Sequence, residues 1–251
     1  MLNKIIEFSA PKHYVDDEVQ KDTFPVPVKL NIPDWYKKLK HAMGEGTAKG
    51  CMPFLDTLTT GYILKAPQDL RIFHGQEIEK EGRIQKSSKQ EASINNAGLP
   101  ININYKDRND VQYPNQVTGW PDLKNKNQGG VIHKIMNPWV IKTPPGYSCL
   151  FLPVLNNNPE KFEAVPGIVD TDTYNQEINF PILLSGFEKT PIDFVIKRGT
   201  PYVQIIPFKR ESWRMKIKEI NPEKSHWRTF LYHTKLFNIY KTFYWKKKDY
   251  K

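Results

Sequence analysis

The chain has 251 residues, of which 12% are aromatic and 25% are charged, a composition typical of a folded protein and unlike that of a disordered one. A chain of this length buries roughly 70–75% of the surface that its unfolded form exposes, so one core is feasible without disulfides. There is no apolar run of 18 residues and the N-terminus turns acidic where a signal peptide is apolar, so we expect no transmembrane helix, no membrane partner and a cytoplasmic location.

The net charge of +10 is concentrated at the C-terminal end of the chain. Residues 209–251 contain 13 Lys and Arg against 4 Asp and Glu, a balance of +9. That leaves 24 basic and 23 acidic side chains in the preceding 208 residues. We call residues 209–251 the basic tail, and we expect the rest of the chain to be nearly neutral.

The cysteines and histidines predict no metal centre. Cys51 and Cys149 are too few and too isolated for a disulfide framework or a zinc site, so we expect two buried, unreactive thiols in a reducing compartment. The six histidines share no metal-ligand spacing. No cofactor is therefore expected, apart from Mg²⁺ if the chain is an enzyme.

The first 50 residues are interpreted as an N-terminal arm. Three prolines exclude a long helix or a central strand there: Pro25, Pro27 and Pro33. Residues 32–39 predict a short helix with an apolar face. The arm is expected to pack on the core, and the alternative is a partner-binding anchor built around Trp35.

The core is expected between residues 51 and 208. Residues 51–73, and 57–64 in particular, are rich in β-branched and aromatic side chains and predict strands. Residues 74–130 form a polar insertion, predicted to hold a few short strands such as 99–105. Strand character returns at 131–156, where Pro144, Pro145 and Gly146 predict a turn between two apolar runs.

The stretch 165–208 has the strongest pattern. Two strands are predicted, at 178–184 and 202–208. Residues 170–173, which we call the acidic turn, precede the first strand, and a Lys-Arg-Gly-Thr-Pro turn precedes the second.

A C-terminal helix is predicted within the basic tail. It begins at Asn221, Pro222 and Glu223 and closes with the lysines of 246–248. Its apolar stripe comprises Phe230, His233, Phe237, Tyr240 and Tyr244.

Four segments in order resemble motifs of the dUTPase and dCTP-deaminase superfamily. Residues 60–70 resemble its first motif, 143–147 the turn that leads into the second, 167–174 the third and 194–204 the fourth. The family patterns read roughly G-x-I-D-x-D-Y-x-G in the third and K-x-G-x-x-x-x-Q in the fourth. The resemblance implies a mainly β protein with a β-clip, a distorted barrel at 51–208 between an N-terminal arm and a C-terminal helix, and a homo-oligomer that is commonly a trimer.

The family's active enzymes hydrolyse dUTP with Mg²⁺ or deaminate dCTP, and several of their motif positions differ here. Ile63 stands where the first motif has Asp, and Val154, Leu155 and Asn156 replace the phosphate-binding Arg-Ser-Gly of the second. No glycine-rich fifth motif follows. The positions that carry over are Asp170 and Asp172 as catalytic candidates, and Tyr62, Tyr174, Lys197, Arg198 and Gln204 as candidates for ligand binding.

Each candidate also has a structural interpretation. Asp170 and Asp172 either pair as base and metal ligand or form a hydrogen-bonded turn. Gln204, in a predicted buried strand, either contacts a ligand or bonds a neighbouring loop. The aromatic and basic residues of the tail form either a packing helix with solvated lysines or a nucleic-acid surface.

Our leading hypothesis is a non-catalytic, dUTPase-like assembly or binding module. The first alternative is a divergent deoxynucleoside triphosphate hydrolase or deaminase that uses Asp170 and Asp172. The second is nucleic-acid binding through the basic tail. Nearly the whole chain also resembles a protein family of phage genomes and some bacteria, through stretches such as 143–151 and 197–211, and that resemblance implies no activity.

Overall fold

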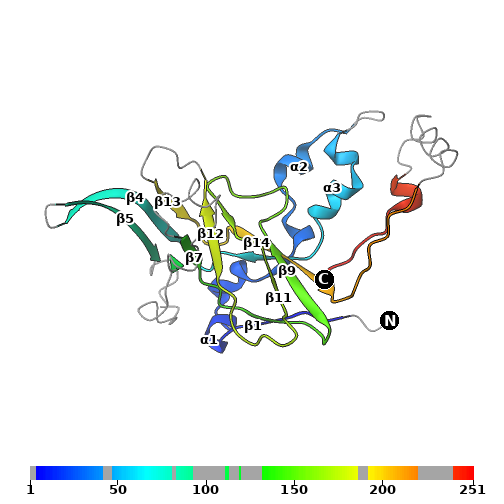
Figure 1. The fold of residues 1–251 in the computed structure, drawn as a ribbon, viewed down its shortest axis with the longest axis horizontal. Helices are drawn as coiled ribbons and strands as arrows, with labels where there is room; N and C mark the ends of the chain where they lie inside the picture. The colour runs from blue at the N-terminus through cyan, green and yellow to red at the C-terminus, as the bar shows by residue number, and fades with distance from the viewer. Residues whose placement is uncertain are drawn as a thin grey trace. The chain divides into compact units, whose positions relative to one another are not determined.

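The computed structural model describes residues 4–41, 47–80, 83–92, 111–112, 119, 132–185, 192–219 and 240–251. The chain forms two compact units (Figure 1). The first unit comprises Met1–Val26 and Tyr62–Lys209, and the second comprises Pro27–Gly61 and Arg210–Lys251. Each unit is therefore assembled from two separate stretches of the sequence.

Short elements begin the first unit. They are β1 (Glu7–Ser9), α1 (Lys12–Val15) and the 3₁₀ helix η1 (Glu18–Thr23). Strand β1 pairs antiparallel with β8 (Val140–Lys142). The Asp17 carboxylate accepts a hydrogen bond from the Val19 N–H, 2.9 Å away, and so caps the first turn of η1.

A five-stranded sheet has the order β11-β9-β14-β3-β2. Its strands are β2 (Val26–Pro27), β3 (Tyr62–Lys65), β9 (Tyr147–Leu152), β11 (Gly167–Val169) and β14 (Pro201–Lys209). The pairs β11–β9, β9–β14 and β14–β3 are antiparallel. The four segments with motif resemblance therefore supply strands, or the turns next to strands, that are neighbours in one sheet.

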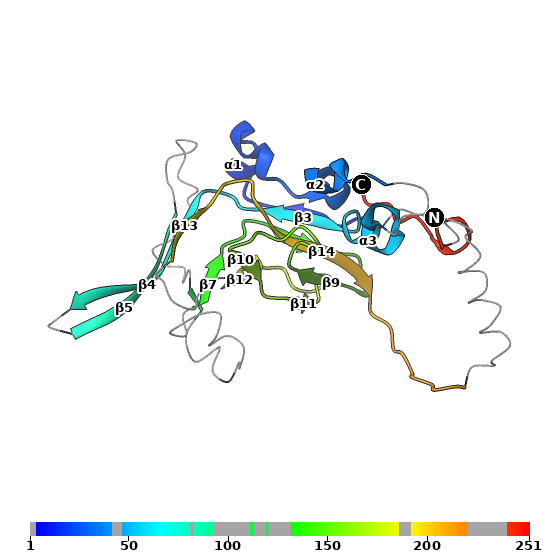
Figure 2. The same ribbon diagram turned by 90° about the horizontal axis from the view of Figure 1, so that it is seen from above.

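Two further sheets complete the first unit (Figure 2). One has the order β10 (Phe162–Ala164), β12 (Phe180–Leu184), β7 (Ile132–Ile135) and β6 (Val111–Gln112). The other has the order β13 (Ile192–Ile196), β4 (Leu70–Lys80) and β5 (Arg83–Ala92). The prediction of a mainly β protein is confirmed, and the strands of the described ranges close no barrel.

The core of the first unit is formed by side chains that alternate along these strands and lie buried between them. In β12, Phe180, Ile182 and Leu184 are buried while the two residues between them are only partly buried, as expected of a strand with one face on a core. The Phe180 ring lies 5.4 Å from that of Phe151 and 5.6 Å from that of Tyr202. These aromatic contacts join β12 to two strands of the five-stranded sheet.

Tyr14 of α1 belongs to the same core. Its ring lies 5.5 Å from that of Trp139, edge to face, and its hydroxyl lies 2.7 Å from the Thr23 hydroxyl. Burial raises the pKa of Tyr14 to about 12. The polar tip of this buried ring is thus paired, as buried tyrosines require.

The second unit begins with short helices. They are η2 (Val28–Asn31), α2 (Asp34–Lys38), η3 (Ala48–Gly50) and α3 (Met52–Thr57). The short helix predicted at 32–39 is confirmed as α2, and Trp35 lies edge to face against Phe54 of α3 at 6.0 Å. Trp35 itself remains about half exposed.

The strand predicted over residues 57–64 is wrong in its first part. Helix α3 ends at Thr57, a turn follows, and β3 begins only at Tyr62. The threonine hydroxyls of Thr57 and Thr59 donate to the carbonyls of Phe54 and Leu55, at 2.7 and 3.0 Å. These β-branched residues, which favour strands, therefore supply hydrogen-bond donors to carbonyl groups at the end of a helix here.

The C-terminal helix is corrected where the structure describes it. The predicted start at Asn221 and the stripe residues Phe230, His233 and Phe237 lie outside the described residues, as does the strand predicted at 99–105. Tyr240–Tyr244 forms a single π-helical turn, and residues 245–251 are not helical. Side-chain bonds explain this, because Trp245 Nε1 donates to Asp56 at 3.1 Å and Lys248 also pairs with Asp56.

No helix in the described ranges is long and apolar enough to cross a membrane.

Candidate functional site

The acidic turn lies directly after β11 and is a hydrogen-bonded turn. The Thr173 and Tyr174 N–H groups donate to the Asp170 carbonyl, at 3.1 and 2.9 Å. The side chain of Asp170 is exposed, whereas Thr171 is fully buried. The interpretation of this sequence as a local turn is thus what the structure contains.

Both carboxylates of the acidic turn bond residues at the start of β9 or in the turn before it. The Asp170 Oδ1 accepts from the Ser148 hydroxyl at 2.6 Å, and the Asp172 Oδ2 accepts from the Gly146 N–H at 2.8 Å. Gly146 has φ of +82°, a left-handed conformation that glycine adopts without strain, and its turn is closed by the Tyr147 N–H on the Pro144 carbonyl at 3.2 Å. The turn predicted from the prolines and Gly146 is confirmed.

Thr171 of the acidic turn is buried together with Thr143 and Cys149. The Thr171 hydroxyl lies 2.7 Å from that of Thr143 and 3.3 Å from Cys149 Sγ. Burial raises the pKa of Cys149 to about 11, so its thiol is neutral at physiological pH. Cys149 fits the prediction of a buried thiol, but the prediction is wrong for Cys51, which is exposed at the N-terminus of α3.

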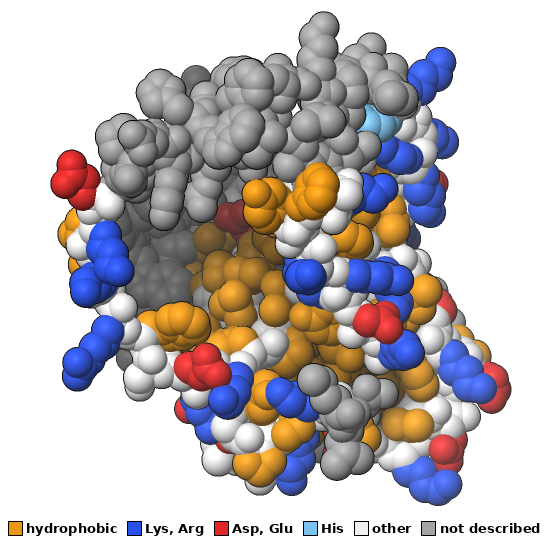
Figure 3. Space-filling model, turned by 90° about the vertical axis from the view of Figure 1, so that its right-hand side faces the viewer, with side chains coloured by type: hydrophobic (Ala, Val, Ile, Leu, Met, Phe, Trp, Pro, Cys, Tyr) orange, Lys and Arg blue, Asp and Glu red, His pale blue; other side chains and the backbone are white. Residues whose placement is uncertain are grey.

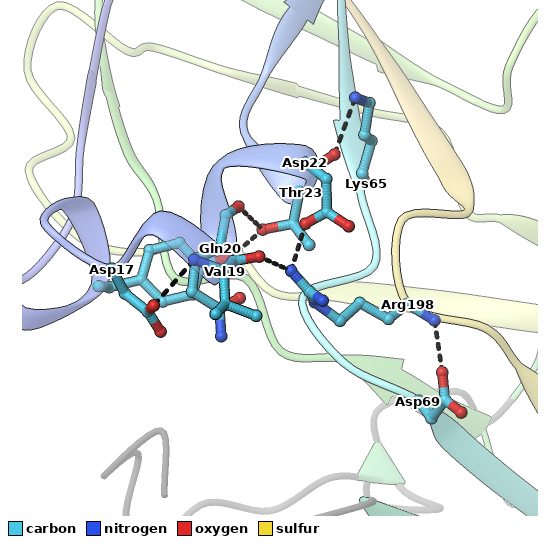
Figure 4. Close-up of polar contacts among 9 residues, drawn as sticks. Asp17, Val19, Gln20, Asp22, Thr23, Lys65, Asp69 and Arg198 are labelled. Carbon is cyan, nitrogen blue, oxygen red and sulfur yellow. Dashed lines mark hydrogen bonds and ion pairs between the residues drawn. The ribbon is translucent and has the colours of Figure 1, made fainter. Parts of the chain in front are cut away.

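Lys197 and Arg198 form the turn between β13 and β14. Asp69 accepts from the Arg198 N–H at 2.7 Å and from Lys197 Nζ at 3.1 Å. The Arg198 guanidinium reaches the opposite way, to the Val19 carbonyl and the Asp22 carboxylate of η1 (Figure 4). These positive charges thus bind groups of the chain itself.

The same junction contains a partly buried lysine. Lys65 Nζ donates to the Asp22 carbonyl at 2.9 Å, and burial lowers the pKa of Lys65 (Figure 4). Arg198 and Lys65 therefore hold η1 against the end of β3 and the turn before β14. Their contacts stabilise the fold.

Gln204 lies in the middle of β14 and is fully buried. Its Oε1 accepts a hydrogen bond from the Leu155 N–H at 3.0 Å. The bond to a neighbouring loop, one of the two interpretations of Gln204, is therefore present in the structure. It satisfies the Leu155 N–H in the loop that follows β9.

The two tyrosines of the candidate set lie in different surroundings. Tyr62 of β3 is partly buried, with its ring 5.6 Å from that of Phe8 and packed edge to face. Tyr174 follows the acidic turn and its side chain is largely exposed. Tyr62 thus contributes to packing, while Tyr174 stays accessible to a partner.

The candidate residues fall into separate groups. Hydrogen bonds join Asp170 to β9 and Asp172 to the turn before it. Lys197 and Arg198 bond Asp69, and Arg198 also bonds η1. Gln204 bonds the loop after β9. Asp69 and Asp22 were missed by sequence reasoning, because Arg198 lies 129 and 176 residues from them. Within the described ranges, no group of three His, Cys, Asp or Glu is placed to hold a metal ion.

No protein-family model matches the chain, and a search of curated proteins finds no matching sequence. Function is therefore inferred from the contacts and burial of the described residues.

Proposed function

We propose that this chain is a non-catalytic assembly or binding module built on a dUTPase-like β-clip core. The observation that carries the proposal is the acidic turn, where Asp170 and Asp172 bond Ser148 and Gly146. A magnesium–triphosphate site requires carboxylates directed at the ion and its phosphates. Carboxylates that hold two turns together serve the stability of the sheet instead.

The burial of two motif positions supports the same proposal. Ile63, at the place of the first motif's Asp, is fully buried, and Val154, at the place of the second motif's Arg, is almost fully buried. Both side chains are aliphatic and offer no ligand for a metal or phosphate. Both residues are part of the core, where polar replacements would cost stability.

The β-clip fold is part of the proposal. Its support is the resemblance of four segments together with their adjacency in one antiparallel sheet, with β14 between β9 and β3. The same resemblance leads us to expect that the module assembles as a homo-oligomer, with further copies of this chain as its partners.

A panel of the deoxynucleoside triphosphates with Mg²⁺ tests the proposal through pyrophosphate, ammonia and thermal shift. We expect no product and no shift in the melting temperature. The thermal shift is sensitive enough for this test, because a ligand at a hundredfold excess over its dissociation constant raises the free energy of unfolding by about 2.7 kcal/mol. Turnover that disappears in Asp170→Asn but persists in Asp16→Asn would overturn the proposal. That result would favour a divergent hydrolase or deaminase.

A second candidate function is nucleic-acid binding through the basic tail. Phe243 and Tyr244 are exposed next to Lys241 and Lys246, a mixture of aromatic and basic side chains suited to stacking on bases and contacting phosphates. The face drawn in Figure 3 likewise carries basic side chains beside hydrophobic ones. A gel shift with a single-stranded oligonucleotide that weakens steeply with salt, and that is lost in Phe243→Ala/Tyr244→Ala, would support this function.

A further inference from the structure

The segment that follows β14 exposes three large apolar side chains in a row of alternate positions. Trp213, Met215 and Ile217 are 86%, 89% and 85% exposed. Residues 210–219 form neither helix nor strand and run as an extended stretch (Figure 2). Single exposed apolar residues are common, but an aligned set of this size marks an interaction surface.

The residue that follows each of them is basic. Arg214, Lys216 and Lys218 alternate with the apolar side chains. Because successive side chains of an extended chain point to opposite sides, the segment has one apolar face and one basic face. This is the pattern of a strand with one face on a core and the other in solvent, yet the side chains of the apolar face are exposed in the part of the chain that the structure describes.

The chain also has a sheet edge that suits such a strand. Among the described strands, β11 is the last of the five-stranded sheet and pairs with β9 on one side. Ile168, at its centre, is 63% exposed. The exposed Asp170 follows directly, so a basic strand added here would meet a negative charge.

We infer that residues 213–217 add as a strand to the edge strand β11 of a second copy of this chain. Edge strands offer unpaired backbone groups to an added strand, and Ile168 offers apolar surface to Trp213, Met215 and Ile217. The two surfaces differ, so the contact is head to tail and closes into a ring when the rotation allows. The inference deepens the proposed assembly role, on which it rests, by naming the partner.

The apolar residues favour a protein partner over nucleic acid for this segment. Only Trp213 can stack on a base, whereas Met215 and Ile217 match an aliphatic surface. If the segment bound nucleic acid, its basic face would carry the affinity, because phosphate contacts dominate such binding. The two faces can therefore be tested against each other.

The first experiment measures the molar mass of the full chain by light scattering over a dilution series. We expect an oligomer that becomes a monomer in Trp213→Ser/Met215→Ser/Ile217→Ser and persists in the matched control Arg214→Gln/Lys216→Gln/Lys218→Gln. A monomeric natural chain, an oligomer unaffected by the apolar variant, or loss in the control alone would overturn the inference. Nucleotide turnover tests the proposed function separately, so the two can fail independently.

The second experiment identifies the edge. Chains carrying Ile168→Cys and chains carrying Met215→Cys, both with Cys51→Ser, are mixed and oxidised, and their tags differ in mass. We expect a disulfide between the two kinds of chain, and Trp35→Cys in place of Ile168→Cys serves as a control at another exposed residue. Absence of the mixed disulfide, or a bond only within a chain that carries both cysteines, would overturn the inference.

Discussion

The Asp172 carboxylate accepts a hydrogen bond from the Gly146 N–H across 2.8 Å, and this bond joins the acidic turn to the turn before β9. Gly146 has the left-handed conformation that glycine adopts without strain. An aspartate that resembles a catalytic residue thus supports a turn 26 residues upstream in the sequence.

Replacement of Asp172 by Ala is expected to destabilise the protein. Hydrogen bonds to charged groups contribute about 1.5–3 kcal/mol, and the lost bond leaves the Gly146 N–H unpaired in a partly buried place. Urea unfolding measures the change. The matched control is Asp16→Ala, whose exposed pair with Lys12 is worth at most about 0.5 kcal/mol. Equal effects of the two substitutions would contradict the structural role.

Gln204→Leu is expected to cost about 1–3 kcal/mol, because the Leu155 N–H loses its acceptor inside the protein. Hydrogen exchange of the Leu155 amide should accelerate in parallel. If Gln204 served a ligand instead, the substitution would leave both the unfolding midpoint and this amide unchanged.

Arg198 and Lys197 are neighbours with different expected effects. Arg198→Ala removes charged bonds to η1 and is expected to cost about 2–3 kcal/mol. Lys197→Ala breaks a pair whose lysine is largely exposed, and the expected loss is below about 1 kcal/mol. Denaturant unfolding of the two variants compares them directly, and a larger loss in Lys197→Ala would contradict the assignment.

The two thiols should react at very different rates. Cys51 is exposed, whereas Cys149 is buried with a pKa raised to about 11, so little thiolate forms there at neutral pH. We expect one fast equivalent with a thiol reagent in the native protein and a second only after unfolding. Mass spectrometry should place the fast label on Cys51, and Cys51→Ser should abolish that phase.

Asp193 is expected to contribute to the stability of the fold, and this contribution should be lost at acid pH. Hydrogen bonds from the Arg71 guanidinium, at 3.0 and 2.7 Å, lower the pKa of Asp193 below its ordinary value. When the pKa of a carboxyl group is lower in the folded state than in the unfolded state, its ionised form stabilises the fold at pH values above the unfolded-state pKa. That stabilisation is lost as the pH falls through the folded-state pKa. NMR titration should show the midpoint rising in Arg71→Gln, and an unchanged midpoint would exclude the pairing.

Much of the β architecture follows from local signals. Strands predicted at 178–184 and 202–208 match β12 and β14 within a few residues, because alternating apolar side chains and flanking turns are encoded in the segments themselves. The Pro144-Pro145-Gly146 turn is equally local. The acidic turn could be named from the sequence, but its partners Gly146 and Ser148 could not.

The failures have a common physical origin in distant contacts and competing local bonds. Residues 51–57 are strand-like in composition, yet a helix forms there, ended by threonine hydroxyls that bond the backbone. The prediction of a helix up to residue 248 fails because Trp245 and Lys248, which follow the π-helical turn, bond Asp56. Asp56 lies 189 residues before Trp245 in the sequence. No window of sequence contains such a pair.

The second unit, built from Pro27–Gly61 and Arg210–Lys251, has a consequence for synthesis of the chain. Asp56 leaves the ribosome 189 residues before Trp245, which corresponds to roughly 10–40 seconds at 5–20 residues per second. During that interval the first half of the second unit waits without its partner while the strands of the first unit emerge. Asp56 then lacks the side chains of Trp245 and Lys248 that bond it in the finished protein, so the nascent chain should depend on chaperones more than the finished protein does.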